Sequence, residues 1–72
     1  MNENNTFGKW LKNQRDDLGL SQKELADKIG IHWVSVNQYE NGKNLPANRT
    51  IRKMSAFFNV DIPSIQKLVK GE

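Results

Sequence analysis

The residues between Trp33 and Asn41 carry side chains that could contact nucleic acid bases. Amide groups can both donate and accept hydrogen bonds, as base edges in the DNA major groove do, and apolar groups can contact a thymine methyl. At helical spacing, one side of this stretch presents amide and apolar groups and no acid: Trp33, Val34, Asn37, Gln38 and Asn41. This side has no obvious packing role, so it is a candidate for reading a base sequence.

Each of these residues has a specific role to test and a structural alternative. Gln38 is the leading candidate because its amide can donate to and accept from adenine. Asn37 is a second candidate for the same contact, with contact to sugar or phosphate alone as its alternative because its side chain is shorter. Val34 can lie against a thymine methyl. Trp33 could stack on the sugar–phosphate backbone, press on a thymine methyl, or be a half-buried aromatic beside Ile31. In an unrelated bundle, Asn37 and Gln38 would be ordinary surface amides.

The surrounding sequence predicts two short helices joined by a tight turn. Apolar residues recur at helical spacing on both sides of a glycine: Leu25, Ala26 and Ile29 before it, Val36 and Tyr39 after it. This glycine, Gly30, lies where a chain leaving a helix commonly turns through a positive φ. Ser21 and Glu24 have the spacing of a capping box, which predicts the start of the first helix. The pattern therefore places the candidate reading surface on the second helix of the pair.

A further helix is predicted before this pair, from Thr6 as its cap to about residue 17. Its apolar residues form a single stripe that we expect to be buried: Phe7, Leu11 and Leu18. Trp10 borders this stripe, and we expect it to cover the last helix. Residues 1–5 are predicted to be a flexible polar tail, and residues 6–70 a single domain.

Two helices are predicted after the pair, and no strand. Asn48 can cap a helix over residues 49–58, after a loop whose Leu45 we expect under the fold. The inward face of this helix comprises Ile51, Met54, Ser55 and Phe58. Asp61 can cap a last helix that runs to about residue 69, with Pro63 in its first turn, where proline is favoured.

The stretch from Leu20 to Gly42 resembles the helix-turn-helix of lambda-repressor-like proteins, also called the XRE or Cro/CI family. The matching residues are Leu20-Ser21-Gln22, Leu25-Ala26, Gly30, Val36 and Tyr39-Glu40-Asn41-Gly42. The resemblance extends from about Phe7 to about Leu68. It implies a compact all-α fold of five helices whose third helix, about residues 33–40, enters the major groove. The implied function is a sequence-specific transcriptional regulator, most often a repressor.

The resemblance also implies roles for residues beside the reading helix. Residues expected to contact phosphate are Gln22, Lys23, His32, Asn41, Lys43, Asn44 and Arg49. Glu40 matches a family residue that pairs with an arginine of the first helix, here Arg15, so we expect a structural ion pair. His32 stands at a cap position where the family usually has Ser or Thr. Because imidazole is a poor cap, we expect His32 at the DNA edge or in solvent.

Family members generally bind inverted repeats as dimers, so we expect a homodimer, at least on DNA. Three apolar residues are candidate dimer contacts, with the monomer core as their alternative: Phe57, Ile62 and Val69. A second interpretation is an antitoxin, in which the same fold binds its own operator and a toxin protein. An enzyme is disfavoured because the chain has no cysteine, a single histidine and no glycine-rich phosphate loop.

The composition agrees with a single DNA-binding domain. The 72 residues carry a formal charge of +3, and the charge is unevenly placed. Residues 1–40 hold five basic and six acidic residues, whereas residues 41–72 hold six basic and two acidic residues. The basic residues Lys43, Arg49, Arg52 and Lys53 form a cluster in the sequence. On charge alone, such a cluster is more often a solvated face. No apolar run has membrane-spanning length and no signal peptide is evident, so we expect a soluble cytoplasmic protein without cofactor, metal or small-molecule ligand.

Overall fold

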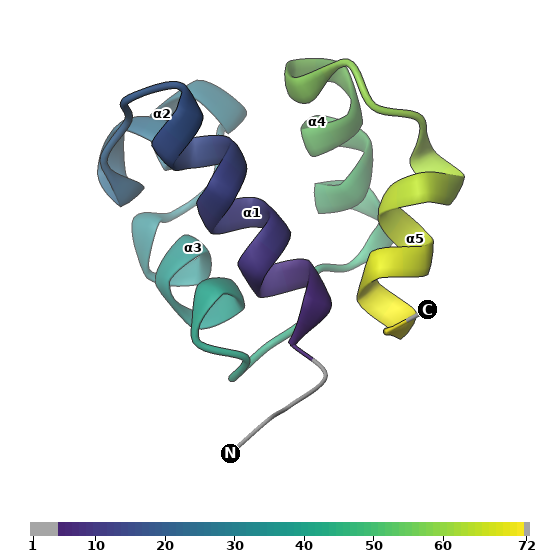
Figure 1. Cartoon of the computed structure of the whole chain (residues 1–72). Coiled ribbons are helices and arrows are strands. Elements are labelled where there is room, and N and C mark those ends of the chain that lie inside the picture. The colour runs from purple at the N-terminus through teal and green to yellow at the C-terminus, as the bar shows by residue number, and fades with distance from the viewer. Residues whose placement is uncertain (1–4, 72) are drawn as a thin grey trace.

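The computed structural model describes residues 5–71 and contains five helices and no strand within that range. The helices are α1 (Thr6–Asp17), α2 (Gln22–Ile29), α3 (Trp33–Glu40), α4 (Asn48–Phe58) and α5 (Ile62–Lys70). In Figure 1, α1 crosses between the α2–α3 pair on one side and the α4–α5 pair on the other. The predicted all-α, five-helix architecture is confirmed. Most of the predicted tail, residues 1–4, lies outside the described range.

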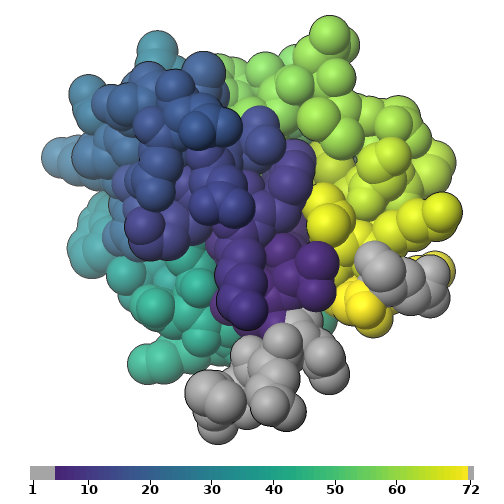
Figure 2. All heavy atoms as spheres, viewed as in Figure 1, coloured from purple at the N-terminus to yellow at the C-terminus, as the bar shows by residue number. Residues whose placement is uncertain are grey.

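The core draws side chains from every helix. The buried apolar residues are Phe7, Leu11, Leu25, Ala26, Ile29, Val36, Tyr39, Ile51, Met54 and Ile65. Helix α1 packs against both α3 and α5, and its atoms fill the space between the two pairs in the space-filling view (Figure 2). The core therefore fixes the helix-turn-helix to α1 and, through α4, to the C-terminal pair.

Two leucines that the sequence pattern assigned to the interior are exposed instead. Leu18 is 53% exposed because α1 ends at Asp17, so this side chain lies past the last helical turn. Leu45 is 55% exposed, and the side chain that turns inward from the same loop is that of Pro46. Periodicity predicts burial only as far as the helix continues, and a loop has no such period.

Two of the predicted helix starts are displaced by one residue. Asn5, not Thr6, caps α1, and its side-chain Oδ1 accepts a hydrogen bond from the Gly8 N–H at 3.1 Å. Asn48 is the first residue of α4 rather than its cap, and the cap position holds Ala47, which has no side-chain acceptor. Asp61 does occupy the N-cap of α5, where its carboxylate accepts from the Ser64 hydroxyl at 2.8 Å.

Aromatic contacts join the first helix to the fourth. The Trp10 ring packs edge-on against Phe58 with ring centroids 5.3 Å apart, so this tryptophan covers the end of α4, where we had expected α5. Phe57, a candidate dimer contact, is half-buried, and the centroid of its ring lies 5.1 Å from that of Phe58. Both phenylalanines pack against the edge of the core.

The start of α2 has the predicted capping box. Ser21 Oγ accepts from the Glu24 N–H at 3.0 Å, and the Glu24 carboxylate accepts from the Ser21 N–H at 2.8 Å. The hydrogen bond that the carboxylate accepts from the Ser21 backbone N–H, followed by the interaction with the Ser21 hydroxyl, lowers the pKa of Glu24. Together the two hydrogen bonds of the capping box define the first turn of α2, which begins at Gln22.

Removing this cap should measurably lower stability. We expect Ser21→Ala to cost about 1 kcal/mol of unfolding free energy, because the Glu24 N–H loses its acceptor. Chemical denaturation monitored by circular dichroism measures the change. Ser21→Thr keeps a hydroxyl and should recover most of the loss. Equal stability of the alanine variant and the wild type would contradict the role of the cap.

Candidate nucleic-acid interface

A tight turn connects α2 and α3, and it contains a left-handed backbone position that favours glycine. Gly30 adopts φ +85° and its N–H donates to the Ala26 carbonyl at 2.8 Å, which ends α2. After this left-handed residue the backbone returns to the extended region at His32, and α3 begins. Val36 and Ala26 are fully buried, so the two helices pack closely and the opposite side of α3 faces outward.

The outward side of α3 carries the predicted base-reading residues. Trp33 is 46% exposed and Val34 is 38% exposed, in contrast to the buried Val36 of the same helix. Asn37 and Gln38 are half-buried. Within residues 5–71, the Gln38 side chain makes no hydrogen bond, so both halves of its amide can pair with a ligand. Val34, Gln38 and the exposed Trp33 thus form one polar and apolar surface without an acid.

His32 caps α3, contrary to the expectation that its imidazole would be a poor cap. Its Nδ1 accepts from the Val34 N–H at 3.1 Å, which satisfies one of the unpaired donors at the helix start. The ring also stacks on Trp33 with centroids 6.2 Å apart. Both rings are exposed, so they form a continuous aromatic edge at the N-terminus of α3.

Arg15 and Glu40 form the ion pair that the resemblance implied. Arg15 Nε donates to Glu40 Oε2 at 2.7 Å, and an Nη donates to Oε1 at 3.0 Å, a bidentate contact. The side chains are 13% and 4% exposed, so the pair is nearly removed from solvent. A further Arg15 N–H donates to the Leu20 carbonyl at 2.9 Å. The hydrogen bond to Glu40 raises the pKa of Arg15 above its usual value.

A row of amide side chains continues from this ion pair, which the sequence analysis did not predict. Gln22 Nε2 donates to Glu40 Oε1 at 3.1 Å. Asn37 Nδ2 donates to Gln22 Oε1 at 3.2 Å, and Asn41 Nδ2 donates to Asn37 Oδ1 at 3.2 Å. Two predicted phosphate ligands, Gln22 and Asn41, thus lie beside a predicted base reader. The sequence indicates this row only through the presence of amide residues at these positions, and it does not show which of them hydrogen-bond to one another.

The remaining predicted phosphate ligands flank α3 on several elements. Lys23 is exposed in the first turn of α2, next to Gln22. Lys43 and Asn44 are exposed in the loop after α3, where the Lys43 N–H donates to the Gln38 carbonyl at 2.9 Å. Arg49 is exposed on a separate element, in the first turn of α4.

Lys53, one of the four residues of the basic cluster, has a structural partner. Its Nζ donates to the Gly30 carbonyl at 3.1 Å, so it connects α4 to the turn of the helix-turn-helix.

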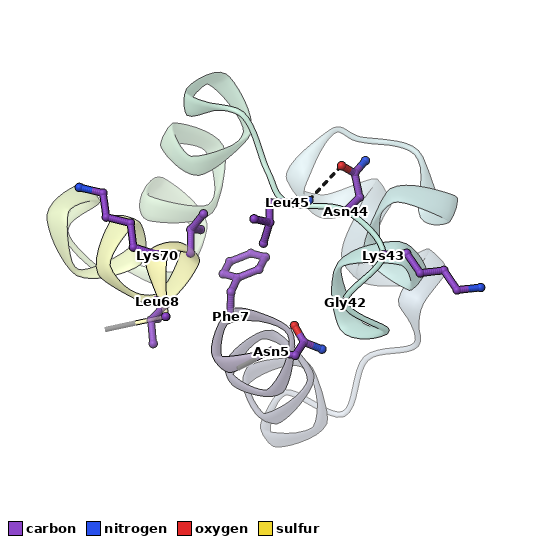
Figure 3. Close-up of a pocket in the computed structure, with 10 residues that line it drawn as sticks. Asn5, Phe7, Gly42, Lys43, Asn44, Leu45, Leu68 and Lys70 are labelled. Atoms are coloured by element: carbon purple, nitrogen blue, oxygen red, sulfur yellow. Dashed lines mark hydrogen bonds between the residues drawn. The ribbon is translucent and has the colours of Figure 1, made fainter. Parts of the chain in front are cut away.

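A pocket of about 480 Å³ lies between the start of α1, the loop after α3 and the end of α5. In Figure 3 the Phe7 ring lies between Leu45 and Leu68, while Lys43 and Lys70 extend away on opposite sides. Val69, a candidate dimer contact, also lines this pocket. The other two candidates, Phe57 and Ile62, pack against the core edge elsewhere. Among the residues that the structure describes, this lining includes no acid and no histidine, and so no pair of groups suited to acid–base chemistry.

Two absences concern the part of the chain that the structure describes. None of its helices has both the length and the apolar character needed to cross a bilayer. No three His, Cys, Asp or Glu side chains among these residues are grouped so that they could hold a metal ion.

A two-helix unit whose second helix presents amide and apolar side chains, flanked by exposed amides and lysines, defines a DNA-binding domain. The helix-turn-helix family profile matches residues 11–65, and the chain belongs to this XRE-type family of DNA-binding transcriptional regulators.

Several curated relatives are similar to this chain. It is 38% identical to the SPbeta prophage-derived HTH-type transcriptional regulator YonR of Bacillus subtilis, over 90% of this chain and 57% of the relative. It is 33% identical to the cryptic phage CTXphi transcriptional repressor RstR of Vibrio cholerae, over 76% and 49%. Identity to the HTH-type transcriptional activator BcrR of Enterococcus faecalis is 29%, over 92% and 31%. The chain thus spans less than two thirds of each relative. No solved structure gives a significant match.

Proposed function

We propose that this chain is a sequence-specific transcriptional repressor that binds an inverted-repeat DNA operator with α3 in the major groove. The observation that carries the proposal is the outward side of α3, where exposed and half-buried amide and apolar groups lie together without an acid. An α-helix fits the major groove, where these groups match base edges. A relative named as a repressor supports the direction of regulation. Acting on DNA, the protein would work in the cytoplasm.

In this proposal the residues divide into readers, which contact base edges, and clamps, which contact phosphate. Gln38 reads adenine through its side-chain amide, Val34 contacts a thymine methyl, and Trp33 lies against the groove edge. Asn37 contributes an amide whose protein partners are described above. Phosphate is held by groups that fix register without reading sequence: Gln22, Lys23, His32, Asn41, Lys43, Asn44 and Arg49.

An inverted repeat requires two copies of the domain. The pocket between α1 and α5 supports a homodimer on DNA, because exposed Leu45 lies beside a hollow lined by Leu68 and Val69. A two-fold contact is self-complementary, and this patch has both a protruding apolar side chain and a hollow. Among the three sequence candidates, Val69 is the one that this geometry favours.

Selection of binding sites from random duplex DNA tests the proposed function. We expect one half-site of a few base pairs, present twice in inverted orientation with centres about one helical turn apart. Sedimentation of the protein on the selected duplex should give two chains per site. Binding of all duplexes with equal affinity would contradict the proposal, and selection of a single half-site would contradict its dimeric part.

Two substitutions should separate clamping from reading. We expect Lys43→Ala to weaken binding to every duplex and to reduce the dependence of log K on log salt by about one. Gln38→Ala should instead cost about 1–3 kcal/mol of discrimination at one or two base pairs, with the salt dependence kept. Fluorescence anisotropy with a salt series and single-base-pair variants measures both. If the two variants weakened all sequences alike, the assignment of reader and clamp would be wrong.

A further inference from the structure

Five side chains form a continuous row of hydrogen bonds from the interior of the domain to its proposed DNA surface. Arg15 donates to Glu40, and Gln22 donates to the same carboxylate at 3.1 Å. Asn37 donates to Gln22, and Asn41 donates to Asn37, each at 3.2 Å. At the buried end of the row the Glu40 side chain is 4% exposed, and at the other end Asn41 is exposed. It therefore connects a buried charge to the reading helix.

The charge at the buried end determines the orientation of every amide in the row. An ionised carboxylate can only accept hydrogen bonds, so Gln22 must turn its Nε2 toward Glu40. The Gln22 Oε1 then faces Asn37, which must donate a hydrogen bond to it from Nδ2. The Asn37 Oδ1 is left for the Nδ2 of Asn41. Reversing any one amide would bring two donors or two acceptors together.

We propose that Glu40 is a positioning residue for DNA recognition, because through Gln22 it fixes which end of the Asn37 amide faces which side of the groove. This inference rests on the proposed reading role of α3. One N–H of Nδ2 and one lone pair of Oδ1 remain after the contacts to Gln22 and Asn41. Those are the groups that N7 and N6 of adenine require. With the amide fixed, Asn37 offers them in one order along the groove.

Replacing the Glu40 carboxylate by an amide removes the constraint on the orientation of the Gln22 and Asn37 amides while keeping the size of the side chain. In Glu40→Gln, one end of the new amide accepts and the other donates, so Gln22 can adopt either orientation. Each orientation leaves one N–H of Arg15 facing an amide N–H, so neither is selected. Asn37 then offers both orders of donor and acceptor, and its preference for one base pair should decrease.

Competition binding on the selected operator tests the inference. The base pair read by Asn37 is first located as the position where Asn37→Ala loses discrimination. At that position we expect Glu40→Gln to lower the ratio of correct to incorrect affinity at least about fivefold, the lower limit for one specific base contact. All proteins are measured well below their melting temperatures, with folding verified by circular dichroism.

Met54→Ala is the control for lost stability. Met54 is fully buried on α4, outside the row, so this variant loses packing but keeps every amide of the row. Its discrimination ratio should stay within about twofold of the wild type. The inference is overturned if Glu40→Gln keeps the wild-type ratio, or if Met54→Ala loses as much. Wild-type protein that prefers no duplex would overturn both the inference and the proposed function, whereas an unchanged Glu40→Gln ratio overturns the inference alone.

A double-mutant cycle tests the row without altering the buried charge, should Glu40→Gln not fold. We expect Gln22→Ala and Asn37→Ala to be coupled, so that the double variant loses no more discrimination at the Asn37 base pair than the larger single loss. Losses that multiply would mean that the two side chains act independently, which overturns the inference. Discrimination at the Gln38 base pair should be unaffected in both single variants.

Discussion

Glu40→Ala is expected to lower the free energy of unfolding by about 3–5 kcal/mol, the range for breaking a buried ion pair by removing one partner. The loss is large because Arg15, only 13% exposed, would keep its charge without the bidentate partner that compensates its burial. Gln22 would lose its acceptor at the same time. Thermal and chemical denaturation at neutral pH measure the change.

Lys12→Ala is the matched control for Glu40→Ala. Lys12 also forms an ion pair, since its Nζ lies 3.1 Å from Asp16, but both side chains are more than half exposed. Asp16 is the less suitable member of this pair, because it also lies 3.8 Å from Arg15. We expect this variant to lose less than about 1 kcal/mol, as exposed pairs generally do. Losses of equal size in the two variants would show that burial does not determine the strength of the Arg15–Glu40 contact.

Gly8→Ala should destabilise the domain by about 1–3 kcal/mol, the usual cost of inserting a methyl group into a filled space. A Cβ on Gly8 would overlap the backbone carbonyl oxygen of Tyr39 and would also collide with the Asn5 side chain. A backbone carbonyl cannot rotate away as a side chain can, so α1 would have to move relative to α3. This cost exceeds the gain of about 1 kcal/mol that alanine usually brings to a helix interior.

Gly19→Ala distinguishes lack of space from backbone strain. Gly19 has φ +67°, and nothing lies within 4 Å of its added Cβ, so this variant meets only the strain of a left-handed residue. In the Gly8 variant the displaced helix carries Asn5, which donates to the Glu40 carbonyl at 3.0 Å. We therefore expect hydrogen exchange to increase at the C-terminal end of α3 only in Gly8→Ala. An unchanged exchange rate there would contradict the proposed displacement.

Periodicity and capping chemistry account for most of what the sequence predicts correctly. The capping box at Ser21 and the left-handed Gly30 are local features, set by residues within four positions, and both are present. The ends of helices are harder to predict from sequence, because two neighbouring residues can both serve as caps. The pair Asn5 and Thr6 is such a case, and the contact of Asn5 with the Glu40 carbonyl decides it. That contact spans 35 residues, so no local pattern contains it.

The candidate interface was predicted in outline but not in its internal contacts. Helical spacing placed Trp33 and Val34 on the outer side of α3, and they are exposed. The same spacing could not show that Asn37 has partners while Gln38 has none within the described residues. The difference depends on Gln22, whose position relative to α3 is set by tertiary packing. Contacts between polar side chains of separate helices are therefore what the sequence leaves open.

The short length of the two central helices has a further consequence. Helices α2 and α3 have eight residues each, too few for an isolated helix to persist in water. Their shape depends on the buried side chains of α1, α4 and α5, so an excised peptide of residues 20–42 would be largely unstructured. Binding of an operator and cooperative unfolding of the whole domain are consequently thermodynamically coupled. Any bound duplex must raise the melting temperature, and heat must release the duplex as the domain unfolds.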